Sequence, residues 1–241
     1  MHFAKEKHFE ALQNAIQLCN AESLYVTGTG KESHKVFHYT LKKNSDHNPS
    51  YILEFASTYV TDQVYKRINE GMESKLMRFL KSSKDYHLLA IVRGHFFERK
   101  AHEILQGGGP FTIRKLAKGH DADKYEEEIE LDPKNEVYFD DLSNEDHKRS
   151  DMYLQPNSET LKSVDSIAPP NAAFQITAST SHSINTNELH KVVKFHNPRG
   201  DMAFRLYIAV PPDKFGSYTK KQKYVNADKT DTVKIPNLVQ S

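Results

Sequence analysis

The sequence predicts a mixed α/β protein in which helices flank a central sheet. The second half of the chain alternates helix-like and strand-like segments in the order helix, strand, strand, strand, helix, strand. The segment 204–210 is almost wholly apolar, which is typical of a strand buried on both faces. Hydrophobic residues make up 37% of the 241 residues, enough for a large core and too many for a disordered chain.

Residues 1–85 predict an α+β extension before this core. Apolar residues recur at helical spacing in 3–19, in 60–71 and around 76–80. Two segments of alternating apolar residues, 36–41 and 51–55, are separated by a turn-forming stretch and predict a hairpin. This part of the chain should therefore form a strand pair with helices.

Residues 86–241 should form the core itself. The first helix is expected to end at three consecutive glycines, 107–109, because glycine adopts the backbone conformations that terminate helices. A last edge strand is expected at 232–235. In chain order we expect a helix at 86–105, strands at 111–116, 151–154, 163–167 and 172–179, a helix at 186–195 and a strand at 204–210.

An acidic insertion, residues 119–150, interrupts this order with 12 Asp and Glu against 4 Lys and Arg. We expect it to be a loop with one extra strand pair around 137–139. The whole chain carries a net charge of +1, so the remainder is basic. A basic body suits a polyanionic partner, although charges dispersed over a solvated surface explain the same composition.

Cysteine content and hydropathy limit where the chain can act. With Cys19 as its single cysteine, the chain cannot form an intramolecular disulfide, in keeping with a reducing compartment such as cytosol or nucleus. The sequence contains no apolar run of membrane-spanning length, and its first residues are too charged for a signal peptide. We therefore expect no membrane association.

Polar residues stand between apolar neighbours on three predicted core elements: Glu98 on the first helix, Asp165 on the second strand, and Gln175 and Thr177 on the third. With the order of the elements, these positions resemble the PD-(D/E)XK, or restriction-endonuclease-like, nucleases. In that superfamily a helix acid, a strand acid and an acid-x-Lys sequence hold Mg²⁺ for phosphodiester cleavage. The resemblance implies Glu98, Asp165 and Gln175 as metal ligands, with Mg²⁺ or Mn²⁺ as the cofactor.

The match departs from the family pattern at its third position. Gln175-Ile176-Thr177 replaces acid-x-Lys, and Thr177 cannot supply the positive charge that polarises the attacking water. Lys162, three residues before Asp165, or Lys100 on the helix is a candidate for that charge. Each residue also has an ordinary structural interpretation: a solvent-facing helical glutamate, a turn aspartate and a buried amide.

Several phrases within about residues 88–215 resemble the C-terminal region of Crinkler effectors and retrotransposon-hot-spot-like proteins. They are Arg93-Gly94-His95-Phe96-Phe97-Glu98, Gly108-Gly109, Tyr153 with Pro156 and Ser163-Val164-Asp165, Phe174-Gln175-Ile176-Thr177 and Val210-Pro211-Pro212. The resemblance implies a virulence effector module that acts on nucleic acid in a host nucleus, after secretion of a longer protein. It also implies that Gln-x-Thr replaces acid-x-Lys in the family.

A basic segment near the C-terminus contains Lys214, Lys220, Lys221 and Lys223, interleaved with Tyr218 and Tyr224. Lysines can grip phosphates while tyrosines stack on bases, although a solvated charged tail fits the same pattern. Nucleic acid, DNA in the first place, is the expected partner. The alternative to a nuclease is an inactive nuclease-like fold that binds DNA or a host nuclear protein, a function that the acidic insertion favours.

Overall fold

The computed structural model describes residues 2–19, 33–43, 49–71, 73–116, 126–157, 161, 164–180, 182–225 and 238–240. The chain divides into two compact units, Met1–Arg99 and Lys100–Ser241. The boundary lies inside helix α5, Ala90–Gly107, because Val92 and Phe96 on its first turns belong to the core of the first unit. The sequence analysis had placed the division after residue 85, before this helix.

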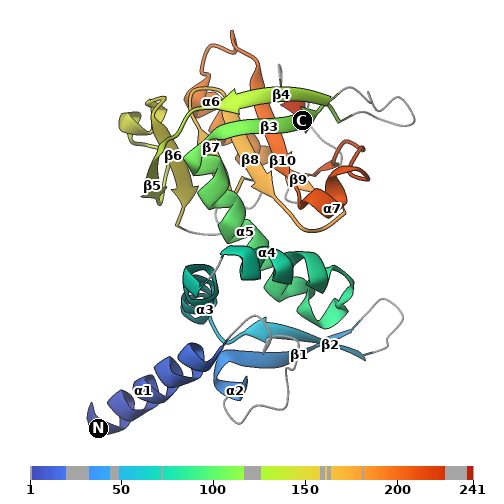
Figure 1. Ribbon diagram of the computed structural model, residues 1–241. Coiled ribbons are helices and arrows are strands. Elements are labelled where there is room, and N and C mark those ends of the chain that lie inside the picture. Colours follow the sequence, from blue (N-terminus) through green and yellow to red (C-terminus); the bar gives the residue numbers. More distant parts are fainter. Residues whose placement is uncertain are drawn as a thin grey trace. The chain divides into compact units, whose positions relative to one another are not determined.

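The first unit combines one hairpin with several helices (Figure 1). Strands β1 and β2 pair antiparallel with Phe37 opposite Phe55, which confirms the expected hairpin. The ring of Phe96 packs against the rings of Phe55, Tyr65 and Phe79, with centroids 5.6 to 5.7 Å apart. The elements are α1 (His2–Leu18), α2 (Ser33–Val36), β1 (Phe37–Lys43), β2 (Pro49–Phe55), α3 (Thr58–Gly71), α4 (Glu73–Ser82), and the short 3-10 helices Ser83–Asp85 and His87–Leu89.

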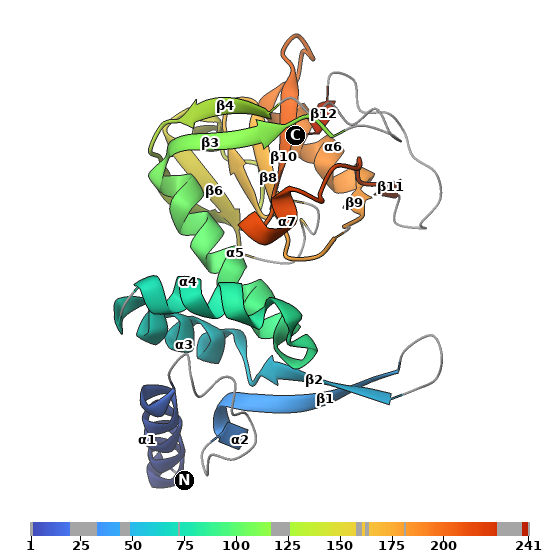
Figure 2. The same cartoon turned by 45° about the vertical axis from the view of Figure 1, so that its right-hand side comes forward.

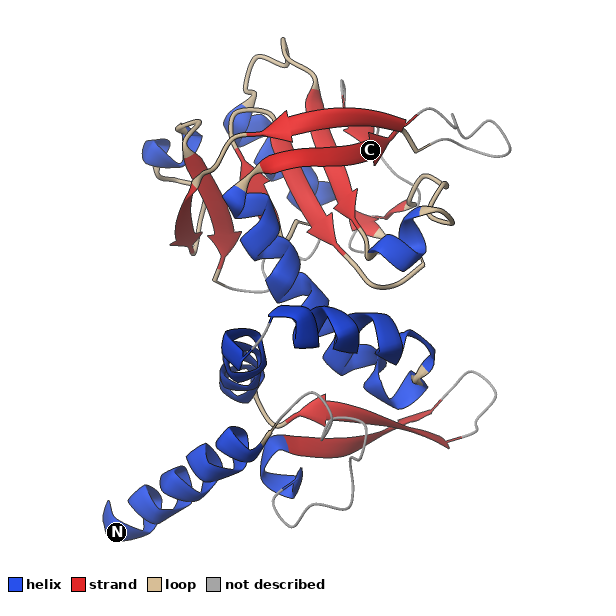
Figure 3. Cartoon of the chain, in the orientation of Figure 1, coloured by secondary structure: helices blue, strands red, loops and turns tan. Residues whose placement is uncertain are grey.

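The second unit is built on a mixed six-stranded sheet in the order β12-β10-β8-β7-β6-β5 (Figures 2 and 3). Strands β6, β7 and β8 are antiparallel neighbours, whereas β10 runs parallel to β8 and β5 runs parallel to β6. The predicted mixed α/β class is thereby confirmed. The strands are β5 (Asn135–Phe139), β6 (Met152–Pro156), β7 (Ser166–Ala168), β8 (Ala172–Ile176), β10 (Phe204–Ala209) and β12 (Leu238–Gln240).

Helix α6, Thr186–His196, follows the pattern expected for an amphipathic helix. The Asn185 side chain accepts hydrogen bonds from the backbone amides of Asn187 and Glu188 and so caps the first turn. Leu189 and Val192 are fully buried, as predicted, and pack in the core of the second unit. Around α6 the chain forms a small parallel pair, β9 (Ile184–Asn185) with β11 (Tyr224–Val225).

The described part of the acidic insertion contains two strands that pair with other elements, rather than one strand pair of its own. Strand β3, Gly109–Arg114, pairs with β4, Glu126–Leu131, in an antiparallel hairpin separate from the main sheet. Strand β5, also from the insertion, joins the edge of the main sheet instead. The 3-10 helix Glu145–Lys148 then leads into β6. The expected strand at 232–235 lies outside the described residues.

Alternation along the strands gives the sheet two distinct faces. On one face, Leu154, Ile167 and Ala173 pack with α6 in the core of the second unit. On the other face, the ring of Phe174 lies 6.3 Å from that of Tyr153 and 5.4 Å from that of Tyr207. This second face is covered by the end of α5 and by the β3–β4 hairpin (Figures 1 and 2).

Among the residues that the structure describes, no helix is both long enough and apolar enough to cross a membrane.

The end of α5 offers a stability test based on two adjacent glycines. Gly108 has a φ of 72°, and an added Cβ would lie 2.4 Å from the Leu131 carbonyl oxygen, whereas a Cβ on Gly107 would meet nothing within 4 Å. We expect Gly108→Ala to lower the free energy of unfolding by about 2 kcal/mol or more, because it adds backbone strain to a clash. Gly107→Ala, the matched control, should be neutral or slightly stabilising. Urea unfolding measures both, and equal effects would contradict this account of the turn.

Candidate functional site

Asp165 lies just before β7 and forms hydrogen bonds with Phe174 and Ile176, the two residues that flank Gln175. Its backbone amide donates to the Phe174 carbonyl oxygen at 2.9 Å, and its Oδ2 accepts from the Ile176 amide at 2.5 Å. The structure therefore brings Asp165 and the Gln175 segment together, as the sequence predicted. The carboxylate, however, satisfies a backbone donor at the end of β8, which is a structural role of the kind an Asx cap performs.

Gln175 lies in the interior of the second unit with no exposed surface. It lies opposite Ile208 of β10 and two residues after Ala173 of β8, on the same face of the strand as Ala173. Ile208 and Ala173 both belong to the core of the second unit. Neither Nε2 nor Oε1 of Gln175 has a hydrogen-bond partner among the described residues. A buried amide without a partner is destabilising by about 1 to 3 kcal/mol.

Thr177, at the position where the family pattern has lysine, is also buried. Its amide donates to the Ala209 carbonyl oxygen at 2.9 Å, and its Oγ1 accepts from the Ser179 amide at 3.0 Å. The side chain therefore shapes the turn after β8. Lys162, the nearest candidate for the missing positive charge in sequence, lies outside the described residues. The other candidate, Lys100, forms an ion pair with Glu103 at 3.2 Å.

Glu98 belongs to the first unit, whereas Asp165 and Gln175 belong to the second. Burial raises the pKa of the Glu98 carboxyl, while the neighbouring charges of His95 and Arg99 act in the opposite direction. Arg99 itself is bound to Asp62 at 2.5 Å. A raised carboxyl pKa is a feature of functional sites and of buried structural acids alike.

The expected ligands for Mg²⁺ do not form a suitable centre in the second unit. Magnesium needs several oxygens directed at one point and usually keeps bound water, whereas Gln175 is enclosed by core side chains. Within the described ranges, no three or more His, Cys, Asp and Glu side chains group as metal ligands would.

A buried network that sequence reasoning missed joins α5 to two strands. Ser166 donates to the Tyr153 hydroxyl oxygen at 2.7 Å, which leaves the tyrosine O–H to donate to His102 Nδ1 at 2.8 Å. Tyr153 and Ser166 have no exposed surface, and burial raises the pKa of Tyr153. Because the sequence gives no sign that a residue on α5 will meet residues on β6 and β7, it could not have predicted this network.

The basic segment predicted for phosphate binding is described at all four lysines. Lys220, Lys221 and Lys223 are exposed and Lys214 is half-buried on the short helix α7, Pro212–Phe215. Within the described part of the chain, none of the four side chains has a hydrogen bond or ion pair. These lysines are free to meet an external anion.

The tyrosines of this segment do not act as the sequence suggested. Tyr218 is 6% exposed and packs in the core of the second unit, and Tyr224 packs against the same core. Neither ring lies open for stacking on a base. The residue that shapes the segment is Gln222, whose Oε1 accepts from the His182 amide at 2.8 Å while its Nε2 donates to the Lys220 carbonyl oxygen at 2.9 Å.

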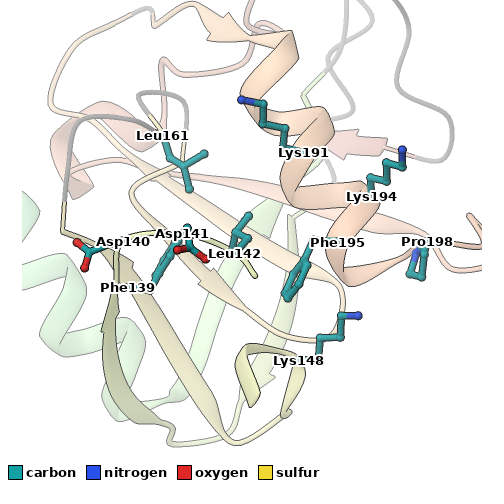
Figure 4. A pocket seen from close by; sticks show the side chains of 10 residues that line it. All are labelled: Phe139, Asp140, Asp141, Leu142, Lys148, Leu161, Lys191, Lys194, Phe195 and Pro198. Atoms are coloured by element: carbon teal, nitrogen blue, oxygen red, sulfur yellow. The ribbon is translucent and has the colours of Figure 1, made fainter. Parts of the chain in front are cut away.

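A pocket of about 560 Å³ lies between α6 and the segment that follows β5 (Figure 4). Its charged lining consists of Lys148, Lys191 and Lys194 with Asp140 and Asp141. Sequence reasoning missed this site, because Lys191 and Lys194 resemble ordinary solvated positions on the outer face of an amphipathic helix. The apolar lining consists of Phe139, Leu142, Leu161, Phe195 and Pro198.

Two buried histidines, His147 and His196, are adjacent in sequence to the lining residues Lys148 and Phe195. His147 packs against Phe139 with ring centroids 5.5 Å apart, and His196 follows Phe195 on α6. Burial, with the nearby positive charge of Lys148, lowers the pKa of His196 to about 4. Among the described residues, neither ring nitrogen of His196 has a hydrogen-bond partner. His196 is therefore neutral near pH 7 and acts as a core side chain.

Comparisons with protein-family models, with curated proteins and with solved structures find no match for this chain.

Gln175 and Gln155 provide a matched test of the buried amide. Gln155 is also buried, at 5% exposure, but its Nε2 donates to Glu136 at 2.5 Å. We expect Gln175→Met to raise the free energy of unfolding by about 1 kcal/mol, because it replaces an unpaired amide by an apolar group of similar volume. Gln155→Met should lower it by about 1 kcal/mol, since it breaks a hydrogen bond. Destabilisation by both substitutions in urea unfolding would contradict the structural role of Gln175.

His196 predicts acid sensitivity with a defined sign. Because its pKa of about 4 in the folded protein lies below the ordinary value of 6.5, the unfolded chain takes up the proton first as the pH falls. The stability contributed by neutral His196 should therefore decline between about pH 6.5 and pH 4, by about 2 kcal/mol from pH 7 to pH 5. The His196→Leu protein should lack this component, which urea unfolding at both pH values would detect. Identical pH profiles for the two proteins would contradict the prediction.

Proposed function

We propose that the second unit is a nucleic-acid-binding module with a nuclease-like sheet that does not cleave its ligand. The proposal rests on the residues that replace the acid-x-Lys sequence of the nucleases. Gln175 is enclosed in the core, and Thr177 supports a turn. An oxygen held in the core cannot meet an ion, a water molecule and a scissile phosphate together.

The order of the elements supports the nuclease-like part of the proposal. Strands β6, β7 and β8 form an antiparallel series, α6 follows, and β10 then pairs parallel with β8. Restriction-endonuclease-like proteins place three strands, a helix and a further strand in the same order after a first helix. In this scheme β6, β7 and β8 correspond to the predicted strands 151–154, 163–167 and 172–179.

The lysines of the basic segment support the binding part. Gln222 is fixed by its hydrogen bonds to His182 and Lys220, and the chain continues into β11. Gln222 is buried, whereas its neighbours Lys221 and Lys223 and the preceding Lys220 are exposed. Fixed, unpaired lysines at close spacing match successive phosphates of a nucleic-acid backbone.

The family resemblance supplies the biological setting of the proposal. A module of this kind, delivered to a host nucleus as part of a longer effector, would encounter DNA in high concentration. Phosphate contacts alone provide affinity without base specificity, so binding would alter access to DNA over many sequences.

The proposal predicts a salt-dependent interaction that rests on three exposed lysines. A labelled DNA duplex titrated with the full chain should bind more weakly as salt increases. The combined Lys220→Ala, Lys221→Ala and Lys223→Ala protein should bind more weakly still, and its slope of log K against log salt should fall by about 2 to 3, since each phosphate contact contributes about 0.9. Fluorescence anisotropy measures both quantities.

The matched control removes the same charge from the other unit through Lys66→Ala, Lys81→Ala and Lys84→Ala, all of them exposed lysines. It should leave the slope nearly unchanged. Plasmid and single-strand DNA incubated with Mg²⁺ or Mn²⁺ should remain intact. Cleavage that is abolished by Asp165→Asn, a substitution that keeps an oxygen for the Ile176 amide, would replace the binding proposal by the nuclease alternative.

A further inference from the structure

The pocket beside α6 arranges its charges with a clear polarity (Figure 4). In this view, Asp140 and Asp141 lie at one side, and Lys148 and Lys194 lie at the other, with Leu142 and Phe195 between them. A ligand that fills the pocket therefore meets carboxylate acceptors, then an apolar surface, then ammonium groups.

The ammonium end is held open by the fold. Lys191 and Lys194 are exposed, lie three residues apart on α6, and have no hydrogen bond or ion pair among the described residues. Lys148 approaches from the 3-10 helix Glu145–Lys148, with its Nζ 4.6 Å from the centroid of the Phe195 ring and 2.8 Å from Glu145. Lys191 and Lys194 are thus free for an anion, but their ammonium groups point apart in Figure 4, so a shared anion requires the Lys191 side chain to turn toward Lys194.

The carboxylate end can accept hydrogen bonds from a ligand. Asp141 accepts from the Ser143 amide at 2.7 Å and from the Ser143 hydroxyl, and these bonds lower the pKa of its carboxyl. Asp140 is exposed, and no hydrogen bond or ion pair engages it within the described residues. Ionised carboxylates only accept hydrogen bonds, so they select N–H groups on a ligand.

We propose that this pocket binds a nucleotide, with its phosphate at Lys194 and, once that side chain turns toward it, Lys191, its flat base against Leu142 and Phe195, and the amino group of that base near Asp140. A volume of about 560 Å³ is within the range of small-ligand sites and accommodates one nucleotide. Adenine, cytosine and guanine carry an exocyclic amino group, so their nucleotides should bind more tightly than that of uracil.

The nucleotide could come from two sources, a free nucleoside monophosphate or the 5′-phosphorylated end of a strand. In the second form the inference rests on the proposed function, whereas in the first it stands alone. The pocket and the basic segment consist of different residues, so each can be disabled without the other.

The test is isothermal titration of the full chain with AMP, CMP, GMP and UMP, with adenosine and inorganic phosphate as partial ligands. We expect AMP to bind at least roughly tenfold more tightly than either partial ligand, because each supplies only one part of the contacts. The combined Lys191→Ala and Lys194→Ala protein should lose AMP affinity by roughly tenfold or more. Lys115→Ala, which removes an exposed lysine outside the pocket, should bind AMP normally.

The failures of this inference and of the proposed function are distinguishable. Absence of nucleotide binding, affinity unchanged by the double pocket substitution, or equal affinity for phosphate and AMP would each overturn the pocket inference, whatever the basic segment does. A preference for a 5′-phosphorylated oligonucleotide over its unphosphorylated form, lost in the pocket variant and kept in the Lys220, Lys221 and Lys223 variant, would identify the strand end as the source. AMP binding without that preference would identify the free nucleotide.

Discussion

The second unit depends on the burial of one hydroxyl group at the junction of three elements. Tyr153 of β6 has no exposed surface, and its oxygen bonds to Ser166 of β7 and to His102 of α5. Loss of any member would leave buried polar groups without partners, which is destabilising by about 1 to 3 kcal/mol per group. The network therefore fixes where the part of α5 that belongs to the second unit lies on the sheet. With α5 in place, the β3–β4 hairpin must begin over the same face, because β3 follows α5 after one residue.

The sequence predicted elements better than it predicted their neighbours. The apolar periods of α6 and β10 depend only on residues close in the chain, and both elements lie where expected. Strand pairing depends on distant residues, so the sequence predicted a strand at 111–116 without identifying its partner. The positive φ of Gly108 turns β3 toward β4, and strand β5 from the acidic insertion takes the sheet edge beside β6. Neither event leaves a periodic signal.

The candidate site shows the same limit at the level of side chains. That Asp165 and Gln175 meet follows from two neighbouring antiparallel strands, and the sequence was sufficient for it. What each group does there depends on its partners. The Asp165 carboxylate accepts a hydrogen bond from a backbone amide, whereas the Gln175 side chain has no hydrogen-bond partner among the described residues. A pattern of residue types does not contain this difference. Tyr218 likewise lies in a polar, basic stretch but packs in the core of the second unit.

A chain with a net charge of +1 can still attract a polyanion if its acidic side chains are paired within the protein while a group of its lysines is not. In the acidic strand β4, Glu126 is paired with Arg114 at 2.5 Å. Part of the negative charge is thus neutralised by an arginine within the same unit. Lys220, Lys221 and Lys223 have no such partners in the described chain. Because charges in physiological salt interact over only about 8 Å, a phosphate responds to these local lysines rather than to the sum over the protein.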